Sequence, residues 1–218
     1  MSYESTALYY KLINEEVNRA LGGLHSAKIL LSSVDFEEIK KLQNAGDWTT
    51  AAAVLTAEAR KLQKAGADFI IISTNTMHKV APEIAANINV PLLHIAAPTA
   101  AKIKADGLKK IALLGTKFTM EHDFYADILR REGLEVLTPD AARRETVHNI
   151  IFDELCKGII KKSSREKFEE IIDGLKARGA QCVILGCTEI CMLVKKSSLP
   201  IYDTTAIHAE TAAHEALK

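Results

Sequence analysis

The chain has 218 residues, 48% of them hydrophobic and 26% charged, and its 28 Lys and Arg residues balance 28 Asp and Glu residues. This length supports a buried core without disulfides, so the four cysteines are predicted to be free thiols and the disulfide-scaffold class is excluded. Zero net charge without a basic block argues against a nucleic-acid partner, and no apolar run reaches the roughly 18 residues that span a membrane. The N-terminus lacks the basic-then-apolar order of a signal peptide, which favours the cytoplasm.

Short β-branched runs alternate with segments of helical period, which predicts an α/β fold with parallel sheets flanked by helices. In chain order the expected elements are a helix over 4–21, a strand over 27–33, a helix over 47–65, strands over 68–73, 91–95 and 109–114, helices over 119–133, 143–158 and 164–179, strands over 181–186 and 200–203, and a C-terminal helix from Thr205. No linker of low complexity separates them.

The two halves of the chain contain an internal repeat. Residues 65–75 parallel 178–189 with one residue inserted, and Val90–His94 parallels Leu199–Asp203. This repeat predicts two pseudo-symmetric lobes, residues 1–96 with 205–218 returning to them, and residues 97–204. Ligands of parallel sheets bind beyond the carboxyl ends of the strands, so the clusters that begin at Ser73 and Cys187 are expected to face each other across a cleft.

Five segments, STNTMHKVAPEI, LLGTKFTMEHDFY, IIFDELCKG, GCTEI and DTTAIHAE, together resemble the cofactor-independent aspartate/glutamate racemases over nearly the whole chain. The resemblance implies an acidic amino acid as substrate, no pyridoxal phosphate, no metal and a homodimer. In the family mechanism one cysteine lies on each face of the substrate α-carbon, where a thiolate removes the proton and the opposite thiol returns one. A thiol with a pKa of roughly 8.5 suits both roles near neutral pH.

The sequence departs from the family pattern at two places. The second cysteine is present as Cys187, but Ser73 stands where the first cysteine is expected. A serine hydroxyl is a much weaker acid, so racemisation is predicted to be impaired, whether Ser73 was engineered or is natural as in a one-thiol branch. The family also begins with a strand and a Gly-Gly-Met turn, whereas this chain opens at the Met1-Ser2 that would follow, so one strand of the first lobe is expected to be missing.

Several hydroxyl and amide side chains are candidates for holding substrate carboxylates. Asn75, Thr76 and Thr188 follow strands at the starts of helices, where the helix dipole favours an anion. Thr116 and Thr119 follow another strand and are candidates for a second carboxylate. Each of these residues also fits simple helix capping.

The resemblance adds Lys161 as a ligand of the side-chain carboxylate and His208 as an imidazole near the second cysteine. No C-x-x-C pair joins the cysteines at 182, 187 and 191, so a zinc site is not expected. Three functions stay open: an impaired aspartate or glutamate racemase, a one-thiol decarboxylase or isomerase of a small dicarboxylate resembling arylmalonate decarboxylase, and a binding module that retains only the carboxylate ligands.

Overall fold

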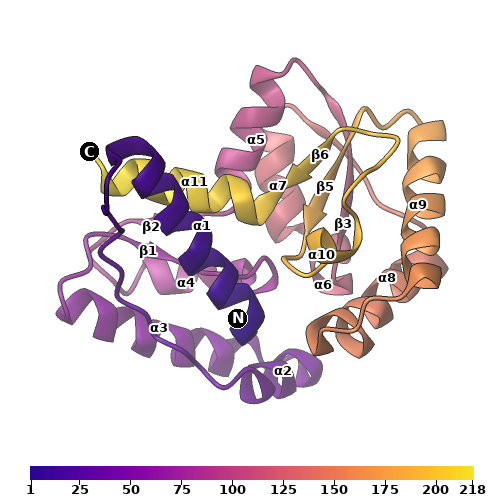
Figure 1. Cartoon of the computed structure of the whole chain (residues 1–218). Coiled ribbons are helices and arrows are strands. Elements are labelled where there is room, and N and C mark those ends of the chain that lie inside the picture. The colour runs from indigo at the N-terminus through magenta and orange to yellow at the C-terminus, as the bar shows by residue number, and fades with distance from the viewer. The chain divides into compact units, whose positions relative to one another are not determined.

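A computed structural model describes residues 1–218 and divides into two compact units. Unit 1 comprises Met1–His94 and Ala209–Lys218, and unit 2 comprises Ile95–His208. Figure 1 traces the chain from its indigo N-terminus to its yellow C-terminus. The last helix, α11 (Thr204–Ala216), begins in unit 2 and ends in unit 1.

Unit 1 combines helices with a small parallel sheet. Its remaining elements are α1 (Tyr3–Leu21), α2 (Phe36–Ala45), α3 (Trp48–Lys64), β1 (Ile70–Ile71), the 3-10 helix η1 (Thr76–Val80), α4 (Ala81–Ala85) and β2 (Leu92–Leu93). Local chemistry sets the helix ends: Asp35 and Asp47 cap α2 and α3 by accepting from the Glu37 and Thr50 amides, at 2.9 and 3.0 Å. Gly46, with φ +69°, ends α2 in the left-handed conformation that glycine adopts without strain.

Strand β1 separates two apolar clusters in unit 1. On one side Ile70 and Ile72 belong to a core with residues of α3, α4 and α2. On the other, Ile71 packs against a cluster in which α1 contributes Tyr9, Ile13 and Val17 and α11 contributes Ala209, Ala212 and Ala213. The four-residue spacing on α1 places its three side chains on one helix face, and the small alanines allow α11 to approach closely.

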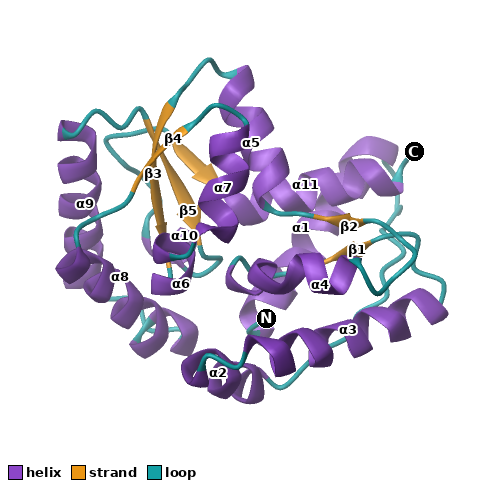
Figure 2. Ribbon diagram, turned by 180° about the vertical axis from the view of Figure 1, so that it is seen from behind, coloured by secondary structure: helices purple, strands orange, loops and turns teal.

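Unit 2 holds a four-stranded parallel sheet in the order β4-β3-β5-β6. Its strands are β3 (Lys110–Gly115), β4 (Glu135–Leu137), β5 (Cys182–Gly186) and β6 (Ile201–Asp203), and its helices are α5 (Ala96–Ala105), α6 (Lys117–Glu121), α7 (Asp123–Arg131), α8 (Ala141–Asp153), η2 (Leu155–Lys157), α9 (Lys162–Ala177) and α10 (Ile190–Leu193). Figure 2 shows α5 and α7 on one face of the sheet and α9 on the other. The central strands β3 and β5 are therefore buried on both faces, as the continuous apolar runs predict.

The predicted α/β class with parallel sheets is confirmed, but two predicted elements were wrong and the short strand β4 was not predicted. Residues 27–33 form no strand, because the sheet of unit 1 consists of β1 and β2 alone and this segment pairs with neither. The helix expected over 119–133 is two helices, since His122 adopts an extended conformation between α6 and α7. Strand β4 has three residues, which are too few to show the alternation of side chains that predicts a strand.

Candidate active site

The carboxyl ends of β3 and β5 lie together because two glycines are in register there. Gly115 pairs with Gly186, and a Cβ on either would lie 2.9 Å from a carbonyl oxygen of the neighbouring strand. No other residue permits so close an approach of the two backbones. The next residue along each strand, Thr116 or Cys187, is thereby positioned at the same edge of the sheet.

Cys187 is half-buried and hydrogen-bonded to an acidic neighbour. Its Sγ donates to Oε2 of Glu189 over 3.0 Å, and Glu189 itself is buried. Burial, the negative charge of Glu189 and the nearby Cys156 together raise the pKa of the Cys187 thiol well above its ordinary value. At neutral pH the group is consequently a neutral thiol whose proton points at a carboxylate.

Sequence reasoning missed two residues of this thiol's environment. Glu189 stands in the GCTEI segment but is not among the predicted site residues, and neither is Cys156. The motif held a signal for Glu189, since a carboxylate two residues from a thiol is its natural hydrogen-bond acceptor. Cys156 lies in η2, far from Cys187 in sequence, and only the fold brings the two sulfurs within electrostatic range.

The two threonines after β3 are buried and cap a helix. Thr116 Oγ1 accepts from the Thr119 amide over 3.4 Å, and the two hydroxyls lie 3.3 Å apart. The Lys117 amide beside them donates to Nδ1 of His148 over 3.2 Å. These contacts satisfy the start of α6 and leave the threonine hydroxyls buried at the strand edge that also carries Cys187.

The start of α11 also meets the end of β5. Thr204 donates its hydroxyl to the Leu185 carbonyl over 3.0 Å, which fixes the buried helix start beside the strand that leads to Cys187. Thr188 and His208 are buried in the same unit. The structure therefore places Thr188 next to the thiol and holds His208 one turn into a helix that is anchored to β5.

Lys161 has a different environment from the other predicted ligands. Its ammonium lies 3.1 Å from Glu154 Oε1, and its side chain is 54% exposed. Glu154 also accepts from the Ser164 hydroxyl, and both contacts lower the pKa of this carboxyl. Lys161 is thus engaged in an ion pair at the solvent-exposed start of α9.

The Ser73 cluster belongs to unit 1. Ser73 follows β1, and its carbonyl accepts from the Ser5 hydroxyl over 2.8 Å and from the Met1 ammonium over 2.6 Å. Asn75, Thr76 and His78 are buried directly after it. His78 Nδ1 lies 2.8 Å from the Thr74 carbonyl, which requires a proton on that nitrogen. The His78 ring is tilted by 60° against that of His94, with the ring centroids 4.4 Å apart.

Neither unit gathers three or more His, Cys, Asp or Glu side chains in a way that would hold a metal ion. No helix combines the length and apolar character needed to cross a bilayer. The chemistry that these positions offer is proton transfer by a thiol and hydrogen bonding by hydroxyl and amide groups.

The structure is a parallel α/β fold with a thiol at the carboxyl end of a central strand, and comparison with known sequences identifies its family. The profile of the Asp/Glu/hydantoin racemase family matches residues 1–212. The chain belongs to this family, and the recognition made from its motifs is confirmed.

Three relatives illustrate the similarity. A solved protein of Yersinia pestis, described as a candidate Asp/Glu racemase, shares 53% identity with a TM-score of 0.92 and covers 100% of this chain and 96% of its own. An aspartate racemase homologue from Pyrococcus horikoshii OT3 shares 33% identity with a TM-score of 0.83 over 100% and 96%. The broad specificity amino-acid racemase RacX of Bacillus subtilis (strain 168) is 30% identical over 70% of this chain, and the match spans 66% of RacX.

Proposed function

We propose that this protein catalyses the cofactor-independent racemisation of an acidic amino acid, aspartate or glutamate, at a low rate. The observation that carries the proposal is the Cys187 thiol directed at Glu189 at the carboxyl end of β5. Family membership and the printed names of the relatives support an isomerase of amino acids. The buried hydroxyls of Thr116, Thr119 and Thr188 supply donors for substrate carboxylates.

Cys187 is assigned to one face of the substrate α-carbon. In one direction its S–H bond breaks as a Cα–H bond forms on the planar carbanion, which leaves a thiolate. In the other direction the thiolate takes the α-proton and the thiol is restored. The neutral resting thiol is ready for the first step, and that step leaves the thiolate that the second step requires.

Ser73 is assigned to the opposite face, because the internal repeat makes it the counterpart of Cys187. An alcohol loses its proton far less readily than a thiol, so proton transfer on this face limits the rate. The presence of serine in place of the family's first cysteine also favours the second candidate, a decarboxylase or isomerase of a small dicarboxylate that needs one thiol only. Both candidates use Cys187 as the proton donor.

Proton exchange in deuterated water tests the assignment. One enantiomer of aspartate or glutamate, for which we choose L, is expected to exchange its α-proton with retention of configuration faster than it racemises. The measurement is NMR of the substrate with chiral analysis, and Cys187→Ala is the control. Equal exchange in both proteins, or none in either, would remove Cys187 from the mechanism. Ready inversion would show that Ser73 or a neighbour such as His78 is a competent acid.

We also propose that this chain forms a homodimer, as the family resemblance implies, and that it resides in the cytoplasm. Light scattering on the purified protein tests the dimer, and a mass equal to one chain at working concentration would contradict it.

A further inference from the structure

Helix α8 holds the beginning of α6 through residues of one helix face. His148 Nδ1 accepts a hydrogen bond from the Lys117 amide over 3.2 Å, and Glu145, one turn earlier, forms an ion pair of 2.6 Å with the Lys117 ammonium. Phe152, one turn later, packs against the His148 ring with the centroids 4.8 Å apart. Spacings of three and four residues place these side chains on the same side of α8, which lies beside α6 in Figure 2.

The peptide unit between Thr116 and Lys117 is bound at both of its polar atoms. Its carbonyl accepts from the amides of Thr119 and Met120, each over 3.0 Å, and its N–H donates to His148. On the other side of Thr116, the glycine pair that joins β3 to β5 fixes the backbone. Thr116, a proposed ligand of a substrate carboxylate, is therefore held between two fixed points of the chain.

His148 can hold this peptide unit in only one protonation state. Because the Lys117 N–H is the donor, Nδ1 carries no proton and the imidazole is neutral. The ring is half-buried and also meets Phe118 edge-on, with the centroids 5.9 Å apart, so two phenyl rings limit its rotation. An imidazolium has two donors and no acceptor, so a protonated His148 would leave the Lys117 amide without this partner.

The titratable groups on this side of α8 and on the helices packed against it carry both signs. They are Lys117, Glu121 and His122 of α6, Arg144 and Glu145 of α8, Cys156 of η2 and Glu170 of α9. Arg144 pairs with Glu121 over 2.9 Å, as Lys117 does with Glu145, so the two positive charges near the ring are each balanced by a carboxylate. Neither sign dominates the surroundings of His148.

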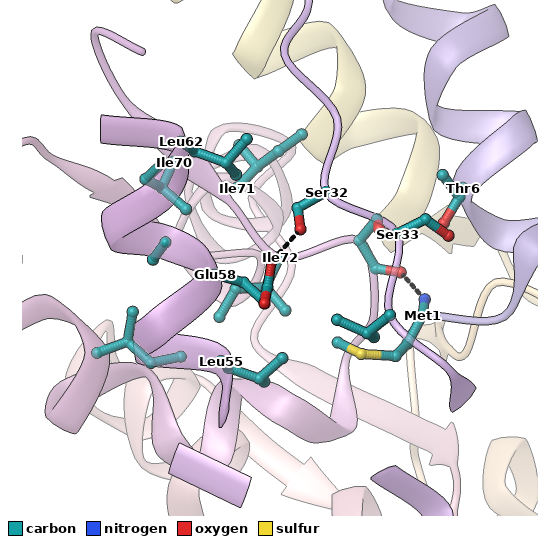
Figure 3. Close-up of a pocket in the computed structure, with 14 residues that line it drawn as sticks. Met1, Thr6, Ser32, Ser33, Leu55, Glu58, Leu62, Ile70, Ile71 and Ile72 are labelled. Atoms are coloured by element: carbon teal, nitrogen blue, oxygen red, sulfur yellow. Dashed lines mark hydrogen bonds between the residues drawn. The ribbon is translucent and has the colours of Figure 1, made fainter. Parts of the chain in front are cut away.

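Carbonyl oxygens are the acceptors at the ends of two other strands. After β1, the Ser73 carbonyl accepts from the Met1 ammonium, as Figure 3 shows for Met1. At the end of β5, the Leu185 carbonyl accepts from the Thr204 hydroxyl. A backbone carbonyl does not titrate, whereas histidine gains a proton between about pH 5 and pH 8. Of these three strand ends, that of β3 is the one that loses an acceptor as the pH falls.

We propose that His148 is a positioning residue of the proposed reaction and makes substrate binding depend on pH. Its neutral imidazole keeps the Thr116 hydroxyl at the strand edge where a substrate carboxylate binds, and its protonated form releases the backbone there. This inference rests on the proposed function, because it takes Thr116 as a carboxylate ligand. His148 acts through the backbone and exchanges no proton with the substrate.

Two substitutions separate the hydrogen bond from the packing. His148→Asn keeps an acceptor, since its side-chain oxygen can take the place of Nδ1 and gains no proton near neutral pH. His148→Phe keeps an aromatic ring against Phe118 and Phe152 but has no acceptor. Calorimetry measures the binding of succinate, a dicarboxylate without an α-amino group, so the readout needs no turnover.

At about pH 8, His148→Phe should weaken succinate binding about three- to tenfold, the worth of one hydrogen bond, and His148→Asn by less than about twofold. When the pH is lowered to about 5.5, the wild type should lose several-fold more affinity than His148→Asn, because only the wild type gains a proton at this position. His214→Phe, which replaces an exposed histidine of α11, is the control and should follow the wild type.

Hydrogen exchange of the Lys117 amide gives a second readout in the free protein. After correction for the intrinsic effect of pH, exchange should be slow in the wild type and in His148→Asn at about pH 8 and faster in His148→Phe.

The proposal is overturned if His148→Asn behaves like His148→Phe, or if the wild type and His148→Asn share one pH dependence. Faster exchange at Lys117 with unchanged succinate binding would also overturn it, because the hydrogen bond would then be structural only. Failure of the racemase function gives a different result: Cys187→Ala would leave α-proton exchange unchanged, while the pH difference between the wild type and His148→Asn would persist.

Discussion

In the proposed mechanism, the rate depends on the group assigned to the second face of the substrate, Ser73. Ser73→Cys would place a thiol after β1, and a thiol is deprotonated far more readily than an alcohol. We expect racemisation of aspartate or glutamate to rise by a factor on the order of 100 or more, the usual contribution of a general acid or base. Polarimetry without pyridoxal phosphate measures the gain. Ser26→Cys, which adds a thiol at an exposed position, is the matched control and should show none.

The carboxylate of Glu189 controls the proton of Cys187. Glu189→Gln removes a negative charge that raises the pKa of the thiol, while the larger effect of burial stays. The alkylation of Cys187 by iodoacetamide, followed by mass spectrometry of its peptide, should therefore shift to lower pH. Glu169→Gln on the exposed face of α9 should leave the profile in place. An unchanged profile in Glu189→Gln would show that the two side chains do not interact in solution.

Single residues show what the sequence could predict of this site. Cys187 was predicted from the repeat and the GCTEI segment, because strand ends in parallel sheets carry functional groups. The environment of Cys187 was not predicted, since the effect of Cys156 depends on how η2 packs near β5. The solvent-exposed ion pair of Lys161 with Glu154 likewise depends on side-chain positions that no motif records.

At the scale of elements, the close approach of β3 and β5 depends on glycine. Gly115→Ala would place a Cβ 2.9 Å from the Gly186 carbonyl and 3.1 Å from Thr119 Cβ. We expect a loss of about 1–3 kcal/mol in the free energy of unfolding, because the backbone or α6 must move. Gly174→Ala is the control, since a Cβ there meets nothing within 4 Å on the exposed side of α9.

The control should gain roughly 0.5–1 kcal/mol, because alanine favours helix more than glycine does. Urea unfolding of both variants measures the contrast. A tolerated Gly115→Ala would mean that the two strand ends are further apart than their register indicates.

The elements that could be predicted are those whose own residue pattern shows which of their faces are buried. The continuous apolar runs of β3 and β5 identify central strands, because both faces of such strands are covered. Residues 27–33 have the same local character, but a strand also requires a neighbour with free backbone groups, and this depends on the fold. The break at His122 between α6 and α7 is equally a property of packing, because the apolar spacing continues across it.

At the scale of the whole molecule, buried and half-buried thiols make stability depend on pH. Burial and Asp106 raise the pKa of Cys182 to about 12, and burial raises those of Cys187 and Cys191 as well. Above the ordinary thiol pKa of roughly 8.5, the unfolded chain releases these protons while the folded chain keeps them. Stability is then complete below that pH and falls as pH rises, by up to about 1.4 kcal/mol per unit for each such thiol.

Urea unfolding at pH values from about 8 to about 11 measures this slope. Cys182→Ala should make the slope shallower, although it lowers stability at every pH because Cys182 is fully buried in β5. An identical slope in the two proteins would mean that Cys182 does not keep its proton in the folded state.

The division of unit 1 into two separate stretches of chain has a consequence for its synthesis. Tyr9, Ile13 and Val17 are made first, yet Ala209, Ala212 and Ala213, which cover them, are made last. Unit 2 is continuous from Ile95 to His208 and is complete before those alanines exist. At roughly 5–20 residues per second, a ribosome needs on the order of 10–40 s to make the intervening chain. Throughout that interval the apolar face of the nascent α1 lacks the three alanines of α11, so this part of its cluster stays uncovered until the last residues are made.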